Sequence, residues 1–590
     1  MDHLRASFLG LTAVLPAAAL LIAVPGAARA QSAADGAARA ALQFQSRQSE
    51  QQRLRQLEEL QRTSRSPTGD LATPPVAANT EKGGRCFKIR TIKVDGAHLI
   101  SNKTIRATVS AWEGRCLGLA EINSVLKAVT FLYVERGYIA SRAFLQEQNL
   151  SKGELSIAIV EGRLDAIRIS GEGDGRFVSA SAFPGMAGKP VNLRDLEQGL
   201  DQLNRLRSNN ATVALNAGGA PGDTVVDVTT RPGSRVHVTM GTDTLGATVS
   251  GIYQSRLDMA LDNVFGVNDL WQFGYLRSSG NSPASSFKER PNSDTVTASM
   301  SVPYGYWTFG IDNAWSEYRS SVQGQVSTID TSGGSLLISP YVTYMIYRDQ
   351  LSKTWVTGRM TWKDTKNDIL GTRIDIASNT LSIASLEVNH SRQILGGQAT
   401  ASFGYQHGLA ILGAVNDASA LVGSPKGEFT KYVASLGYTR PFNLGPVMPI
   451  FSTYLMGQWT PDHLFGTEQL SLGGYASIRG VRDAILFADR GALARNEFSL
   501  LLPALGSPDM ARLMGRIEPY LAIDVGYAAP NVGDPVGSGG TLVGAAAGVR
   551  NRAGRISFDV WYAQLIVKPS MPLASMPPTS LVQGRVSISF

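Results

Sequence analysis

The chain has 590 residues, with 55 lysines and arginines against 48 aspartates and glutamates, and only two cysteines. Charged residues make up 17%, below the roughly 25% usual in soluble domains, although the hydrophobic share is an ordinary 43%. The length indicates several domains or one very large closed sheet, and the composition excludes collagen, disordered chains and disulfide-dense scaffolds.

Residues 1–30 have the pattern of a secretory signal peptide. Arg5 precedes an apolar run, and an Ala-Arg-Ala sequence at 28–30 forms a cleavage site. A short membrane anchor is the alternative, which Pro16 and the small residues before the cleavage point disfavour. No later apolar run approaches the roughly 20 residues that a membrane-spanning helix requires.

Export of the chain affects the expected state of its two cysteines, Cys86 and Cys116. In an oxidising compartment they can form a disulfide, which would contribute about 3 kcal/mol by closing the loop between them. Two unpaired buried thiols are the alternative. An even number of cysteines in an exported protein favours the bond.

Residues 31–62 contain a polar helix. Between 37 and 62 there is no glycine or proline, and alanine, glutamine, arginine, leucine and glutamate dominate. Most of this helix is polar on all sides, so it needs a hydrated environment. It is either a solvated linker or short coiled coil, or a helix inside a polar cavity. Residues 63–84, with three prolines, predict a flexible linker.

Two small α/β units follow, at residues 85–164 and 165–232. The first predicts the order strand, helix, helix, strand, strand, at 87–96, 101–114, 120–136, 141–146 and 154–160. The second predicts a strand, a helix and two strands, at 166–170, 193–206, 211–215 and 224–230. The two units therefore form a tandem repeat.

From residue 233 to 590 helical periodicity nearly disappears. Segments of about ten residues alternate apolar with polar or small residues, as at Val236, Val238 and Met240. A water-soluble sandwich would also alternate. So many strands without covering helices favour a closed barrel, because closure removes edges that aggregate. At about 22 residues per strand and connection, the segment predicts a membrane β-barrel of about 16 antiparallel strands.

Several motifs in this order resemble those of a known family. In the first unit they are Cys86-Phe87, Cys116-Leu117, Arg136-Gly137-Tyr138, residues 148–155 and Glu161-Gly162. In the second they are residues 197–206 (EQGLDQLNRL) and 221–224 (PGDT). Together they are similar to the outer-membrane transporters of two-partner secretion, the haemolysin and filamentous-haemagglutinin secretion proteins. The resemblance implies two POTRA domains and an N-terminal plug helix before the barrel.

Within the barrel, Ile478, Arg479, Gly480 and Val481 resemble the family's lid-loop motif. In that family the loop folds into the lumen, and its arginine pairs with an aspartate of a strand motif. Asp524 is the corresponding residue here. Strand alternation supports this role, because it places Asp524 on the face opposite Leu521 and Ile523, and thus toward the lumen. The pair is either part of transport or a staple that only holds the loop.

Two positions depart from the family motifs. Val481 stands where the lid motif has an aromatic residue, and Ala522 stands where the strand motif, which ends at Gly526, has phenylalanine. The missing rings leave room that either loosens the lid or is filled by other side chains.

The resemblance also implies a location and a partner. The POTRA domains would lie in the periplasm and capture the N-terminal secretion domain of a large, unfolded exoprotein. Outer-membrane lipid would surround a monomeric barrel, and the helix within 31–62 would plug the lumen until activation. No G-x-x-x-x-G-K-[ST] loop is present, so no nucleotide or other cofactor is expected. Folding of the exported exoprotein, the passenger, outside the cell would then drive transport.

Other functions find less support. An outer-membrane assembly factor or insertase of the same superfamily is the main alternative, disfavoured by only two POTRA domains and a preceding plug helix. A diffusion porin would need neither the domains nor the lid. Six dispersed histidines, with no H-E-x-x-H or G-x-S-x-G motif, predict neither an enzyme nor a metal site. The net charge of +7 includes no dense basic run, so nucleic acid is not an expected partner.

Overall fold

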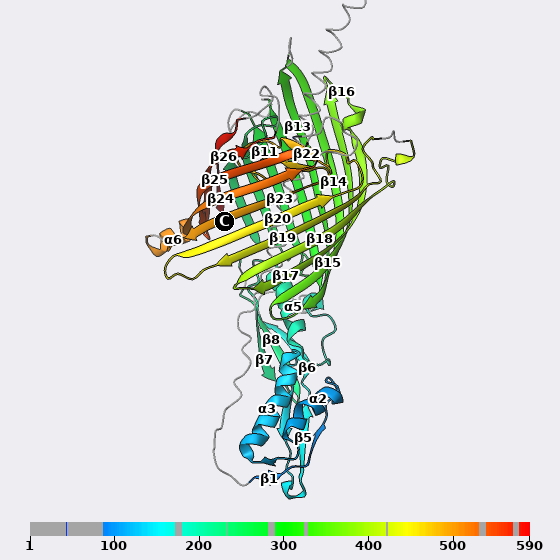
Figure 1. Cartoon of the computed structure of the whole chain (residues 1–590), viewed down its shortest axis with the longest axis vertical. Helices are drawn as coiled ribbons and strands as arrows, with labels where there is room; N and C mark the ends of the chain where they lie inside the picture. The colour runs from blue at the N-terminus through cyan, green and yellow to red at the C-terminus, as the bar shows by residue number, and fades with distance from the viewer. Residues whose placement is uncertain are drawn as a thin grey trace, which may run out of the picture.

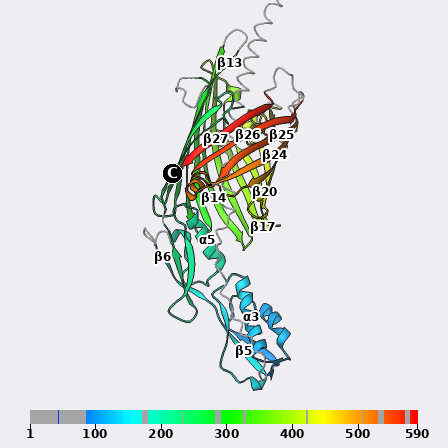
Figure 2. The same cartoon turned by 90° about the vertical axis from the view of Figure 1, so that its left-hand side faces the viewer.

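Two small α/β modules form a stalk next to a large β-barrel. The computed structural model describes residue 43 and residues 86–170, 180–231, 233–280, 290–323, 328–419, 423–504, 506–529, 539–569 and 578–590. Figure 1 shows the modules (blue to cyan) below the barrel (green to red), and Figure 2 shows the second module between the first and the barrel. We call the barrel end that faces the modules proximal and the other end distal.

The segments predicted before the modules fall outside this description. The signal peptide at 1–30, the plug helix at 31–62 and the linker at 63–84 lie outside the described residues, apart from Gln43, which is helical.

The first module is a three-stranded sheet covered by helices. Its elements are β1 (Phe87–Lys88), β2 (Thr91–Asp95), α2 (Asn102–Val109), β3 (Cys116–Leu117), α3 (Leu119–Glu135), β4 (Arg142–Leu145) and β5 (Glu154–Val160). β5 is central, parallel to β2 and antiparallel to β4. Residues of α3 three or four apart pack on this sheet, namely Ile122, Val125, Val129 and Tyr133.

Two predicted boundaries in this module were wrong. The strand expected at 87–96 is divided, because Ile89 N bonds to Arg115 O at 2.9 Å whereas Arg90 N bonds to Gly153 O at 2.7 Å. The chain thus changes sheet partners at this point. The helix expected to reach residue 114 ends as an α-helix at Val109 and continues as one 3-10 turn, Ser110–Trp112.

The second module repeats the plan with fewer elements. It contains β6 (Arg163–Ser170), α5 (Leu193–Asn204), β7 (Thr212–Ala217) and β8 (Asp223–Thr229), with β8 in the middle of the sheet. α5 ends two residues before its predicted end, because the Asn204 side chain bonds to both the N–H and the C=O of Ala211, at 2.6 and 2.9 Å.

Among the helices in the described ranges, none is both long and apolar enough to cross a membrane.

Sixteen long antiparallel strands form a closed barrel, which confirms the predicted fold class. They are β9 (Val236–Asp243), β10 (Tyr253–Asp262), β11 (Leu270–Ser279), β12 (Asn292–Tyr304), β13 (Trp307–Gln323), β14 (Thr328–Arg348), β15 (Ser352–Ile369), β17 (Asn379–Ile394), β18 (Gly397–Leu409), β19 (Thr430–Pro441), β20 (Met448–Trp459), β23 (Gly491–Leu501), β24 (Arg516–Ala528), β25 (Gly540–Arg552), β26 (Ile556–Val567) and β27 (Ser580–Ser589). A short strand, β16 (Thr372–Arg373), extends β15. Closure occurs where β27 pairs with β9.

Side chains alternate between the lumen and the outer surface. On β24, Leu521, Ile523 and Val525 are exposed outside, whereas Ala522 and Asp524 are buried inside. Aromatic pairs lie near both ends of the outer surface: Trp307 with Tyr344 at the proximal end, 4.4 Å between ring centroids, and Tyr432 with Trp459 at the distal end, 5.7 Å. This distribution is typical of a barrel whose outer surface contacts lipid.

Candidate functional site

A long loop of residues 460–490, the lid loop, connects β20 to β23 and folds into the lumen. It contains a hairpin of β21 (Leu470–Leu472) and β22 (Leu486–Ala488), with the predicted motif at the tip. Arg479 Nε and Nη2 each donate to a carboxylate oxygen of Asp524 at 2.7 Å, and Arg479 N donates to the same carboxylate at 3.0 Å. The structure thus brings the two predicted residues together as a buried, bidentate pair.

Further charged groups surround this pair. Arg479 Nη1 donates to Glu497 Oε2 at 3.2 Å, and Arg495 Nε lies 3.6 Å from Asp524 Oδ1. Glu497 also pairs with Arg550 of β25. Each carboxylate therefore has a second cation besides Arg479. The sequence analysis did not identify these residues, although alternation on β23 would have placed Arg495 and Glu497 on the same inward face.

The tip also packs against an apolar part of the inner wall. Ile478 and Val481 are buried in one cluster with Leu493, Leu542 and Leu565 of the wall. Val481, where the resemblance implied an aromatic residue, therefore has an apolar environment of its own.

Two motif glycines allow this close contact. Gly480 has a φ of 108°, and a Cβ there would lie 2.4 Å from Leu565 N, so both its conformation and its position need glycine. A Cβ at Gly526 on β24 would lie 3.0 Å from Ile478 Cδ1. Larger residues at either position would push the tip away from the wall.

Aromatic residues from other positions surround Ala522. It packs in a cluster with Tyr520 and Trp561 of the wall, against Tyr475 of the lid loop. The rings of Tyr475 and Trp561 lie 5.0 Å apart. Arg495 lies over the Tyr475 ring, 5.9 Å from its centroid, so an aromatic group still contacts the charged network.

The base of the lid loop has a separate ionic contact. Glu468 lies between two lysines of the wall: Lys363 Nζ on β15 and Lys431 Nζ on β19 each donate to its carboxylate at 2.7 Å. Burial alone would raise the pKa of Glu468, but the two ammonium groups outweigh it and lower the pKa to about 2. Glu468 is therefore ionised throughout the physiological pH range.

This contact predicts a specific pH dependence of stability. Because the folded-state pKa of about 2 lies below the ordinary value of 4.5, the contribution of Glu468 is complete above about pH 4.5 and is lost as the pH falls through about 2. We expect the unfolding free energy of the wild type to exceed that of Glu468→Gln by a constant amount from pH 8 to pH 5. The difference should shrink only below pH 4.5. Urea unfolding at several pH values measures it, and a difference that disappears by pH 6 would contradict the assignment.

The two cysteines are joined. A disulfide links Cys86 to Cys116, with 5.4 Å between their Cα atoms. It connects the start of the first module to β3, next to the pairing of Phe87 with Leu117. The bond therefore secures the end of the first module that lies farthest from the barrel.

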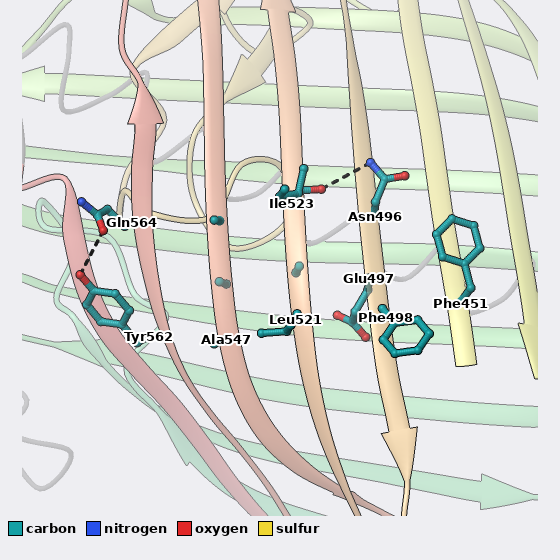
Figure 3. Close-up of a pocket in the computed structure, with 12 residues that line it drawn as sticks. Phe451, Asn496, Glu497, Phe498, Leu521, Ile523, Ala547, Tyr562 and Gln564 are labelled. Atoms are coloured by element: carbon teal, nitrogen blue, oxygen red, sulfur yellow. Dashed lines mark hydrogen bonds between the residues drawn. The ribbon is translucent and has the colours of Figure 1, made fainter. Parts of the chain in front are cut away.

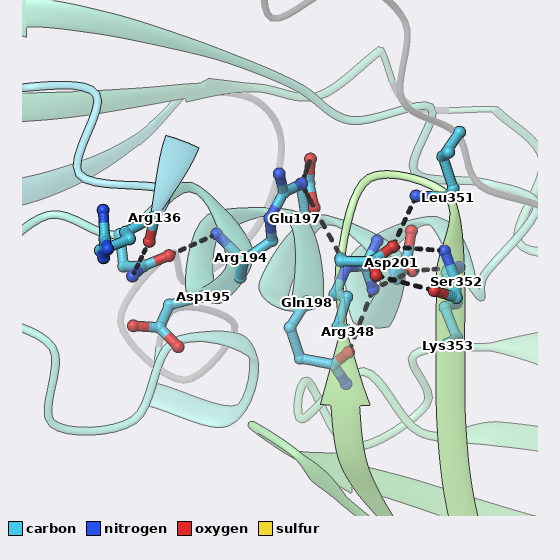
Figure 4. Close-up of polar contacts among 12 residues, drawn as sticks. Arg136, Arg194, Asp195, Glu197, Gln198, Asp201, Arg348, Leu351, Ser352 and Lys353 are labelled. Atoms are coloured by element: carbon cyan, nitrogen blue, oxygen red, sulfur yellow. Dashed lines mark hydrogen bonds and ion pairs between the residues drawn. The ribbon is translucent and has the colours of Figure 1, made fainter. Parts of the chain in front are cut away.

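The second module is held to the proximal end of the barrel by buried ion pairs (Figure 4). Arg348, at the end of β14, donates from Nε to Glu197 Oε2 of α5 at 3.2 Å and also pairs with Asp201. Lys353 Nζ of β15 donates to Asp201 Oδ2 at 2.7 Å. The Arg348 side chain is 2% exposed, so this contact excludes water almost completely.

Uncharged contacts extend the same junction to the turn between β12 and β13. Gln198 and Gln202 both donate to Gly305 O, at 3.2 and 2.9 Å, and Gly305 N donates to Ser181 O at 2.8 Å. The motif at 197–206 therefore includes a helix face that docks on the barrel. Sequence reasoning did not assign it this role, because polar residues on a helix ordinarily indicate a solvated face.

A hollow of about 500 Å³ lies over β20 and β23 to β26, as Figure 3 shows. The large side chains around it are exposed residues of the outer surface: Phe451, Phe498, Leu521, Ile523 and Tyr562. Of its two side-chain amides, Asn496 donates to Ile523 O at 3.4 Å within the wall, and Gln564 accepts from Tyr562 Oη at 3.5 Å. These exposed side chains place the hollow on the lipid-facing side of the wall.

Four of the described histidines make side-chain hydrogen bonds. His463 Nδ1 lies 2.8 Å from Asp489 Oδ2, and His237 Nε2 lies 3.2 Å from Asp262 Oδ2. Within the described parts of the chain, no three His, Cys, Asp or Glu side chains are grouped so that they could hold a metal ion.

Comparisons with known proteins agree with this geometry. The family model described as haemolysin secretion/activation protein ShlB/FhaC/HecB matches residues 222–551. The model of the ShlB-type POTRA domain matches residues 87–162, and a second POTRA model matches 163–217. The two modules are thus POTRA domains.

Individual relatives cover nearly the whole chain. The outer membrane transporter CdiB of Dickeya dadantii is 33% identical over 90% of this chain and 91% of its own. The hemolysin transporter protein ShlB of Serratia marcescens is 28% identical, over 84% and 86%. The solved structure of CdiB from Escherichia coli superposes with a TM-score of 0.82 and 32% identity, covering 94% of this chain and 98% of that one.

Proposed function

Because the chain belongs to the ShlB/FhaC/HecB family of haemolysin secretion/activation proteins, we propose that it exports one dedicated exoprotein. It is an outer-membrane transporter of two-partner secretion, with its POTRA domains in the periplasm. The proximal end of the barrel is therefore periplasmic and the distal end extracellular. In this proposal the unfolded passenger passes from the POTRA domains through the lumen, without cofactor or catalysis.

The observation that supports the proposal most is that the second POTRA domain is fixed directly beside the entrance of the barrel lumen. Helix α5 is fixed to the turns at the proximal rim through Arg348, Lys353 and Gly305, so a chain held by the modules is close to the lumen entrance. A diffusion porin would need no such junction. An insertase would release its substrate into the membrane, whereas here the lid loop and its charged partners occupy the lumen itself.

The first POTRA domain offers an edge for the passenger. Among the strands that the structure describes, β4 pairs only with β5, and its residues Phe144 and Leu145 are exposed. An extended chain can add to such an edge, where main-chain hydrogen bonds supply affinity and exposed apolar groups supply selectivity. We propose that the secretion domain of the passenger binds along β4.

Placing a charge on this edge should weaken capture. We expect Phe144→Asp to reduce secretion severalfold, because an apolar contact is lost and a carboxylate must be desolvated at the interface. Leu119→Asp is the matched control, since Leu119 is also exposed on the first module but lies at the far end of α3. Passenger in the medium is measured by immunoblot. Equal secretion by both variants would contradict binding along β4.

Deletion of the chain tests the function itself. We expect the loss of one large secreted protein, with all other outer-membrane barrels present at normal levels in the membrane proteome. Loss of many barrels would instead indicate the assembly factor or insertase. An unchanged set of secreted proteins would show that the chain exports none of them under the conditions tested, and would refute the proposal.

A further inference from the structure

The two ends of the lid loop are bound to each other, independently of the tip. Asp489, just before β23, accepts hydrogen bonds from Leu464 N at 3.0 Å and Gln469 Nε2 at 3.1 Å, and it also contacts His463. Asp489 is completely buried. Residues 460–469 and 488–490, which we call the lid base, therefore form one compact unit.

The lid base is fastened to one side of the wall. Glu468 bridges Lys363 and Lys431, which belong to β15 and β19, two strands separated by β17 and β18. Gln458 of β20 adds hydrogen bonds to the carbonyl oxygens of both Glu468 and Asp489, at 3.1 Å each.

The tip is fastened elsewhere. Besides the contact of Arg479 with Asp524 on β24, Arg482 Nη1 donates to Thr244 O at 2.6 Å, and Thr248 Oγ1 donates to Asp483 at 2.6 Å. Thr244 and Thr248 lie between β9 and β10, and five long strands, β10 to β14, separate β9 from β15. The lid loop thus crosses the lumen and is attached on both sides.

The attachments of the tip and of the base differ in the charged wall residues that would lose their partner if the contact broke. If Arg479 moved away, Asp524 would keep Arg495 and Glu497 would keep Arg550. If Glu468 moved away, Lys363 and Lys431 would have no other carboxylate within salt-bridge distance among the residues that the structure describes. Because an unpaired buried charge is far more costly than a re-paired one, the tip is the end that can open.

We propose that Glu468 is a positioning residue that acts as the pivot of the lid: the base remains on the wall through Lys363 and Lys431 while residues 470–488 swing out of the lumen. The inference rests on the proposed function, in which a passenger needs the space that the lid occupies. The lid would then return to the same position after each passage, because its base never leaves the wall.

Thiol labelling in the purified, passenger-free barrel tests this proposal separately from secretion. The two native cysteines are bonded to each other, so an introduced cysteine is the only free thiol. Thr467→Cys reports on the base and Ala484→Cys on the tip, and both positions are buried. The probe is a bulky hydrophilic maleimide, and the labelling rate is normalised to that of the unfolded chain.

In the Arg479→Ala background we expect labelling to rise about tenfold or more at Ala484→Cys and to stay unchanged at Thr467→Cys. In the Glu468→Gln background the reverse is expected. Equal increases at both positions with Arg479→Ala would show that the loop leaves as one body, and protection of Thr467→Cys in the Glu468→Gln background would show that Glu468 is not the attachment. Either result overturns the proposal.

A milder variant covers the case in which Glu468→Gln does not assemble. Lys363→Met keeps the contact between Glu468 and Lys431, so we expect a smaller increase at Thr467→Cys. Lys366→Met is the matched control, because Lys366 lies three residues further on β15, is half exposed and pairs with Asp364 rather than with the lid. Equal labelling of these two variants would also overturn the proposal.

Discussion

Arg479→Ala is expected to lower secretion at least about tenfold while the barrel still assembles in the outer membrane. The change removes the bidentate contact with Asp524 and the contact with Glu497, which together hold the tip against the wall, while Arg495 and Arg550 still neutralise the two carboxylates. A tip without this contact no longer has one defined position in the lumen. Asp524→Ala should have a similar effect, because it leaves Arg479 with Glu497 alone.

Two further variants make this test specific. Arg479→Lys should also be impaired, because an ammonium group keeps the charge but cannot form the bidentate contact. Arg256→Ala is the control, since Arg256 pairs with Asp243 of the neighbouring strand at 3.3 Å and is 42% exposed. Secreted passenger is compared with the amount of folded barrel, which migrates differently from the heated form in gels. Wild-type secretion by both Arg479→Ala and Asp524→Ala would show that the ion pair only holds the loop in place and has no part in transport.

Arg348→Ala should release the second POTRA domain from the barrel and reduce secretion to a comparable extent. The change leaves Glu197 with Arg194 of its own helix and Asp201 with Lys353, so each carboxylate keeps one cation, but the second module loses its most deeply buried ion pair with the barrel. Because each carboxylate keeps one cation, the cost stays below the roughly 3–5 kcal/mol of an uncompensated buried charge. We nevertheless expect the loss of the most deeply buried pair to convert a fixed junction into a mobile one.

Spin labels at Lys189 on the second module and Leu395 on a proximal turn measure this mobility, because both positions are exposed. We expect one narrow distance distribution for the wild type and a broad one for Arg348→Ala. Arg319→Ala is the control, since Arg319 is half exposed and pairs with Glu317 of its own strand. A narrow distribution in Arg348→Ala would show that the uncharged contacts at Gly305 suffice to hold the module.

The alternation of apolar and polar residues along the strands, and the repeated order of helices and strands before the barrel, made much of the fold predictable. The pattern of period two placed Asp524 inside and Leu521 outside, and both lie there in the structure. The tandem α/β pattern gave the two modules, although one predicted strand is divided at Ile89 and two predicted helices end earlier than expected. These features depend on local sequence, because burial on one side of a strand or helix fixes residue type at a regular spacing.

The charged contacts were less accessible from sequence. Glu468 and its partner Lys363 are 105 residues apart, and Arg348 is 151 residues from Glu197. Nothing in the local pattern distinguishes a lysine or glutamate that meets a buried partner from one that is solvated. Likewise, the aromatic residues around Ala522 come from β24, β26 and the lid loop, so only the closed barrel shows that they fill this region.

The central claim is that the passenger travels through the lumen, and site-specific photocrosslinking tests it most directly. Thr361 and Met360 are adjacent on β15; Thr361 shares the inward face with Lys363, which contacts the lid, and Met360 faces outward. A photoreactive amino acid is placed at each position in cells that are secreting the passenger. We predict a crosslink to the passenger from position 361 and none from 360. A crosslink from 360, or none from 361 during active secretion, would contradict passage through the lumen.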